Sequence, residues 1–218
     1  MTEAISNFFS EVFKDNVILA TIIIAIVPLI ELKGAIPFAM SPSFWGENAL
    51  SMWGAFLYAF LGGVAVTLVL ALIFKPIYEA IKDKKFFKSF VEFFTSSARK
   101  KSSEIEEDSK NSDAKKKLWI KLFSTFLFVA IPVPGTGVYT GTCLAILLGL
   151  NYWQATISVT LGNFVAGIII TTICAIFPNF TNIIFYIFIA LMLAFLIYRI
   201  IVHFINKKSQ NNTNEKSE

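Results

Sequence analysis

The sequence predicts an all-α integral membrane protein, an inverted repeat in which each half is a re-entrant hairpin followed by a transmembrane helix, with an additional C-terminal transmembrane helix. Three observations predict this fold class. Hydrophobic residues make up 56% of the 218 residues, and the mean hydropathy of +0.66 is high for a soluble domain. Residues 122–198 contain no charged residue and no histidine. Two short apolar runs each end in a group of prolines and glycines, and a long apolar run follows each group.

The first half of the chain predicts one half-crossing and one full crossing. Residues 1–16 are polar with apolar side chains at helical spacing, which predicts an interfacial amphipathic helix. The uncharged run 17–30 is too short to span a membrane, because a crossing needs about 20 residues. The uncharged run 49–74 is long enough. Residues 17–74 therefore form the first predicted membrane repeat.

The segment 75–121 is predicted to be cytoplasmic. Its first part, 75–94, mixes lysine with phenylalanine, which is typical of a basic amphipathic helix at a membrane surface. Its second part, 96–117, has too few apolar residues for a core and is predicted to be a disordered linker.

The second half of the chain, 122–205, repeats the order of features in the first. A short apolar run again ends in a break, PVPGTGVYTG at 132–141, and a short leg returns from it. Two candidate spans follow at 152–177 and 180–204, and the tail 206–218 is predicted to be disordered and cytoplasmic.

The distribution of positive charge predicts the orientation of these segments. Residues 75–121 hold thirteen of the nineteen Lys and Arg residues, and the chain from Arg199 onward holds four more. The positive-inside rule places both regions in the cytoplasm of a multi-pass protein of the cell membrane. The two hairpins then enter from opposite faces. Irregular backbone is tolerated at membrane depth only against protein or water, so we expect their tips to meet around a polar cavity near the midplane.

The first hairpin tip, IVPLIELKGAIPFAM at 26–40, carries two charges. Glu31 and Lys33 lie beside Gly34 and Pro37. Ionisable residues inside membrane segments are expensive and usually functional, so Glu31 is a candidate proton or cation site and Lys33 a candidate anion site. A structural ion pair, or a lysine that reaches the membrane surface, is the alternative.

The second tip carries no charge, and its candidate residues are Pro132, Pro134, Gly135, Thr136 and Gly137. Its glycines can expose successive backbone N–H groups, and a helix that begins at about Thr140 would add a modest anion site at its N-terminal end. A plain helix break is at least as good an interpretation. The pattern is not a nucleotide-binding loop, because no lysine followed by serine or threonine comes after it.

Other candidates for chemistry are few. Asn163 beside Gly162 is a modest candidate for the wall of a cavity. His203 is the single histidine, and Cys143 and Cys174 have no metal-ligand spacing, so we expect no metal site and no cofactor. An enzyme is not expected, because the membrane segments contain neither a nucleophile–histidine pair nor a second carboxylate.

The motif ELKGAIP, followed about a hundred residues later by PVPGTGVYTG, resembles the bacterial and archaeal putative small multidrug export proteins, which are similar to the DedA/VTT-domain membrane proteins. This resemblance implies an inner-membrane transporter with two opposed re-entrant hairpins. It places the family's acidic position on Glu31 and its basic position on Lys33. DedA relatives carry arginines near the second hairpin; this chain has none there, which argues against a lipid-phosphate substrate.

The function hypothesis is a proton-coupled exporter of small amphipathic compounds, or a flippase of lipid-like substrates. The expected partners are membrane lipids and a small-molecule, lipid-like or ionic substrate, with no nucleic acid; a homodimer is compatible with the sequence. The alternative is a non-transporting component that scaffolds partners or remodels lipids through the basic segment 75–94.

Overall fold

The computed structural model describes residues 12–13, 16–81, 101–104, 114–133 and 135–178, and short runs between 181 and 197. These residues are helical and contain no strand, which confirms the all-α prediction for this part of the chain. Most of the predicted interfacial helix, of the basic segment, of the linker and of the last span lie outside the described residues, as does the tail.

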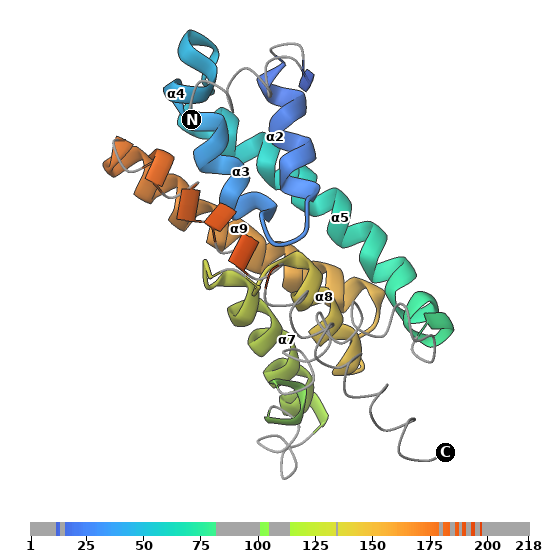
Figure 1. Ribbon diagram of the computed structural model, residues 1–218. Coiled ribbons are helices and arrows are strands. Elements are labelled where there is room, and N and C mark those ends of the chain that lie inside the picture. Colours follow the sequence, from blue (N-terminus) through green and yellow to red (C-terminus); the bar gives the residue numbers. More distant parts are fainter. Residues whose placement is uncertain are drawn as a thin grey trace, which may run out of the picture.

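Two short helices form the first hairpin. Helix α2 (Val17–Ile26) begins at Asn16, whose side chain accepts a hydrogen bond from the Leu19 N–H at 3.0 Å. It ends before Pro28, because the residue that precedes a proline is pushed towards extended conformations. After a tight turn, helix α3 (Glu31–Met40) returns along α2 (Figure 1).

The long helix α5 (Met52–Ile81) follows two short elements, α4 (Pro42–Trp45) and the 3₁₀ turn η1 (Gly46–Asn48). The sequence placed the end of this helix at Phe74, but the structure continues it through Pro76 to Ile81. A proline removes one backbone hydrogen bond without always ending a helix, and Glu79 and Ala80 beyond it are good helix formers.

The second hairpin consists of α7 (Ala114–Ala130) and α8 (Val138–Leu147). Helix α7 includes the last four residues of the predicted linker, 114–117. At the far end of α8, Lys121 Nζ donates to the Leu148 carbonyl at 2.7 Å, where a cation satisfies a helix C-terminus. Helix α9 (Tyr152–Ile176) starts directly afterwards.

Helix α9 begins with a reciprocal cap. The Asn151 side chain accepts from the Gln154 N–H, and the Gln154 side chain accepts from the Asn151 N–H, both at 3.0 Å. This cap sets the start of α9 at a defined residue.

The long helices α5 and α9 pack against each other and follow the same diagonal in Figure 1, with α2 and α3 above them and α7 and α8 below in this view. Both are long and apolar enough to cross a membrane, over 52–73 and 152–176. Large apolar side chains such as Leu57, Leu72 and Ile157 are exposed on their outer faces, as lipid contact requires.

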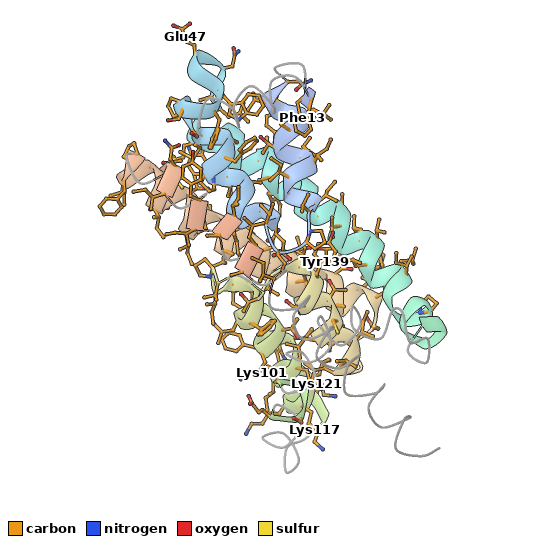
Figure 2. All side chains as sticks on the ribbon, viewed as in Figure 1. Phe13, Glu47, Lys101, Lys117, Lys121 and Tyr139 are labelled. Atoms are coloured by element: carbon orange, nitrogen blue, oxygen red, sulfur yellow. The ribbon has the colours of Figure 1, made fainter. Side chains whose placement is uncertain are left out.

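The two ends of the bundle differ in charge. At one end the 41–48 connection meets the start of the C-terminal segment, where Asn182 Nδ2 donates to Ser43 Oγ at 2.6 Å. Figure 2 shows Glu47 at that end, Lys117 and Lys121 at the opposite end, and Tyr139 between them. Lys101, Lys117 and Lys121 therefore lie together at one end of the bundle.

Close helix packing depends on Gly162, where α9 touches α7. A Cβ at this position would lie 2.6 Å from the Phe126 carbonyl oxygen and 2.8 Å from Val129 Cβ. We expect Gly162→Ala to lower the free energy of unfolding by about 2 kcal/mol, because the contact includes backbone that cannot move aside. The measurement is thermal unfolding of the purified protein in detergent.

The matched control for this prediction is Gly54→Ala near the start of α5. Its added Cβ would meet Ser51 Oγ at 3.2 Å and nothing else closer than 3.8 Å. Alanine favours the helix over glycine by about 0.5–1 kcal/mol, so this variant should be neutral or slightly stabilised. Equal losses in Gly54→Ala and Gly162→Ala would contradict the packing argument.

Candidate functional site

The carboxylate of Glu31 lies between the two hairpins. Glu31 is the first residue of α3 and is only 5% exposed. Its Oε1 accepts a hydrogen bond from the backbone N–H of Tyr139, in the first turn of α8, at 3.4 Å. The N-terminal ends of two ten-residue helices, α3 and α8, therefore converge on one carboxylate. Both helix dipoles favour a negative charge there.

The backbone turn before Glu31 is strained. Leu29 has φ 75° and Glu31 has φ 52°, both in the left-handed region that non-glycine residues seldom occupy. Such conformations cost about 1–3 kcal/mol each and persist where the surrounding structure holds them. The turn thus aims the Glu31 side chain at the second hairpin at an energetic cost.

Gly137 provides the space for this carboxylate. A Cβ built on Gly137 would overlap all three terminal atoms of the Glu31 carboxyl group. The residue before α8 must therefore be glycine for Glu31 to lie where it does. Gly135 is a different case, because it adopts φ 86° and has open space around it, so its role is to make the turn.

Lys33 binds the second tip through contacts of its own. The side chain is 1% exposed, and its Nζ donates to the Val133 carbonyl at 3.0 Å and to Thr136 Oγ1 at 3.1 Å. Thr136 Oγ1 in turn bonds the Ile131 and Val133 carbonyls, so the cation is held by neutral oxygen atoms of the turn. The two charges feel each other electrostatically, but they form no direct ion pair in the described part of the chain.

These contacts separate the predicted site residues into groups. Glu31 and Lys33 lie next to Gly137 and Thr136, and the sequence analysis proposed all four as residues of one site. Gly34 and Pro37 are buried within α3, and Pro132 is half-buried in the turn. Pro134 lies outside the described residues.

Asn163 occupies a neighbouring position on α9, against α5. A Cβ on Gly63 would overlap its Nδ2, so the two helices touch at this pair. Asn163 is 1% exposed, and neither amide atom has a hydrogen-bond partner among the described residues. One helical turn away, Val159 and Val66 pack with Val138 at the start of α8. The Asn163 amide therefore lies close to the level of the hairpin tips.

Tyr139 is a site residue that the sequence analysis did not identify. Its backbone N–H binds Glu31, and its hydroxyl donates to the Ile26 carbonyl at the end of α2 at 2.5 Å. It thereby ties the second hairpin to both helices of the first. The available signal was its position two residues after the Gly-x-Gly turn, where an aromatic residue is easily interpreted as apolar packing.

The site combines one buried acid, one buried base and two helix N-termini, without a cluster of His, Cys, Asp or Glu that could hold a metal ion in the described ranges. An acid held by backbone N–H groups can exchange a proton or a cation. A cation held by carbonyl and hydroxyl oxygens can exchange those neutral ligands for an anionic group. The residues between the two hairpins are therefore chemically able to bind ions and to exchange protons.

A model of one protein family, described as putative small multi-drug export protein, matches residues 31–169 of the chain. The matched region begins at Glu31 and includes α3, α5, α7, α8 and most of α9. Neither the curated proteins nor the solved structures include a match. Since the matched residues make up more than half of the chain and contain the whole site, the chain belongs to the family of putative small multi-drug export proteins.

Proposed function

We propose that the protein is a secondary transporter of the cell membrane that uses protons to export small amphipathic compounds or to move lipid-like substrates. The proposal includes a binding site near the membrane midplane, formed by two re-entrant hairpins that enter from opposite faces. The main observation in support is that both buried charges of the first hairpin bind the second hairpin. Lys33 binds its turn, and Glu31 binds the start of α8.

Such an arrangement supports the coupling of proton binding to movement of the hairpins, because the contact between the hairpins depends on the charge of Glu31. A proton on Glu31 removes the negative charge that two helix N-termini and Lys33 stabilise. The hydrogen bond from the Tyr139 N–H weakens at the same time, because bonds to a charged acceptor are the stronger kind. The protonated state thus favours separation of the hairpins, and the deprotonated state favours their contact.

A transporter also needs parts that can move against a rigid frame. Here α5 and α9 form the frame, and each hairpin joins it through short connections at 41–51 and 148–151. Discontinuous helices whose N-termini face a central site are a common design of secondary transporters. The exposed apolar faces of α5 and α9 would contact lipid in this arrangement.

The test is transport by purified protein in sealed vesicles under an imposed pH gradient. Release of a small amphipathic dye and translocation of a labelled phospholipid are followed separately, together with internal pH. We expect Glu31→Gln to reduce proton-linked movement of either substrate to the rate of empty vesicles, because glutamine cannot take up a proton.

Glu47→Gln is the matched control, since Glu47 is an exposed acid in η1 at the end of the bundle. It should keep the wild-type rate. Proton-linked transport that survives in Glu31→Gln would remove Glu31 from the proposal, and an absence of any protein-dependent flux in wild type would count against transport itself.

A further inference from the structure

One face of α9 carries polar groups whose hydrogen bonds are unaccounted for. Thr156, Thr160 and Asn163 follow one another at helical spacing and so lie on the same side of the helix. The hydroxyl oxygens of both threonines and both amide atoms of Asn163 are buried and have no hydrogen-bond partner in the part of the chain described. Buried polar atoms in native proteins are nearly always satisfied by protein or by ordered water.

Three other buried threonines behave differently, whereas Thr125 on α7 and Thr171 farther along α9 also have no hydrogen-bond partner among the described residues. Thr21, Thr67 and Thr142 each donate to the carbonyl four residues earlier, at 2.6, 2.8 and 2.6 Å. This local bond is the ordinary way in which a threonine inside an apolar helix satisfies its hydroxyl. Thr156 and Thr160 do not make it, so their hydroxyls are turned to an environment outside their own helix.

The polar face runs between two features of the structure. At its start, Tyr152 and Ala155 line an open pocket of about 510 Å³, whose lining also includes Pro76 of α5 and Gly149 after α8. At its other end, Asn163 contacts Gly63 at the level of the hairpin tips, as described above. The pocket lies at the end of the bundle where Lys121 binds Leu148 (Figure 2).

We infer that Thr156, Thr160 and Asn163 line a water path along α9 that connects this pocket with the Glu31 site. Water molecules along the face would supply the hydrogen bonds that the chain does not, and each hydroxyl can accept one and donate one. A proton that enters from the pocket passes along these hydrogen bonds and ends on the Glu31 carboxylate, which becomes a neutral acid. Proton delivery rests on the transport function proposed above, whereas the hydration of the path does not.

Cysteine substitution tests the path without knowledge of the substrate. In a parent chain with Cys143→Ala and Cys174→Ala, single cysteines are placed at 156 and 160, where they nearly match threonine in size. Control cysteines are placed at Ile157 and Leu161, which are 55% and 52% exposed on the outer face of the same helix. A small, charged methanethiosulfonate reagent is added to either side of sealed vesicles.

We expect Thr156→Cys and Thr160→Cys to react at least about tenfold faster than Ile157→Cys and Leu161→Cys, because the reactive thiolate forms only where water reaches the sulfur. The reaction should occur from the vesicle side that carries the 75–121 loop. Equal, slow reaction at all four positions would overturn the inference, and so would reaction from the opposite side alone.

A second measurement separates this inference from the proposed function. Thr160→Val removes the hydroxyl at constant size, and Thr160→Ser keeps it. If the path delivers protons, Thr160→Val slows proton uptake several-fold and Thr160→Ser restores it; equal uptake in the two variants rejects delivery along this face. If Glu31→Gln leaves transport unchanged while the labelling pattern holds, the coupling proposal fails and the water path remains.

Discussion

Gly137→Ala is expected to separate the two hairpins and to lower the free energy of unfolding by about 3 kcal/mol. The new methyl group would occupy the position of the Glu31 carboxylate, so that the acid must leave the N-terminus of α8. The variant therefore loses a charge-assisted hydrogen bond and leaves a buried carboxylate without its donor. Thermal unfolding in detergent measures the stability.

Two other glycines provide the controls for this prediction. Gly135 and Gly149 adopt φ 86° and 74°, and neither has any atom within 4 Å of an added Cβ. Alanine at either position costs backbone strain of about 1 kcal/mol and creates no clash. A Gly137→Ala variant as stable as Gly149→Ala would mean that the carboxylate does not depend on this space.

Gly137→Ala also distinguishes the site from a plain helix break. If the Gly-rich turn served only to end α7 and start α8, alanine at Gly137 would be tolerated, because its backbone conformation is extended and not left-handed. The expected loss arises from Glu31, which is 106 positions away in the sequence. A suppressor at the contact, Glu31→Ala in the Gly137→Ala background, should recover part of the lost stability by removing the overlapping group.

The breaks in both hairpins could be predicted from proline and glycine, since few residues stop a helix as reliably. The structure has helix ends at Ile26 and Ala130, close to the predicted breaks. The family assignment drawn from the same two motifs is confirmed by the match over 31–169. The helix ends and the family motifs depend on residues that are neighbours in the sequence, so the sequence alone could reveal them.

What the sequence could not show is how the tips fit together. That Glu31 lies over Gly137 and that Tyr139 reaches Ile26 are contacts between segments about a hundred residues apart. The spacing of residues along the sequence does not predict which residues of two distant segments will be in contact. The extension of α5 beyond Pro76 was missed for a different reason, because a proline lowers the stability of a helix without always ending it.

Lys33→Met is expected to lower the free energy of unfolding by about 1–3 kcal/mol, because the buried Glu31 carboxylate loses a nearby positive charge, although the two form no direct ion pair. Methionine keeps the length and flexibility of the side chain. The Val133 carbonyl and Thr136 Oγ1 lose their cationic donor as well. Lys101→Met, at an exposed position in a surface ion pair, is the control and should change stability by less than about 1 kcal/mol.

The informative comparison is the double variant Glu31→Gln/Lys33→Met. Both buried charges are then gone, so the double variant should be more stable than Lys33→Met alone, and the two effects should deviate from additivity by about 1–3 kcal/mol.

Proton binding to Glu31 is chemically close to Glu31→Gln, since each removes the negative charge and keeps the size. The coupling energy therefore measures how strongly a proton on Glu31 changes the hold of Lys33 on the second hairpin. A value of 1–3 kcal/mol corresponds to a shift of about 5–150-fold between two states, enough to drive an alternating cycle. Additive effects would instead show that the two charges act independently, and a proton on Glu31 could not then release the contact that Lys33 makes.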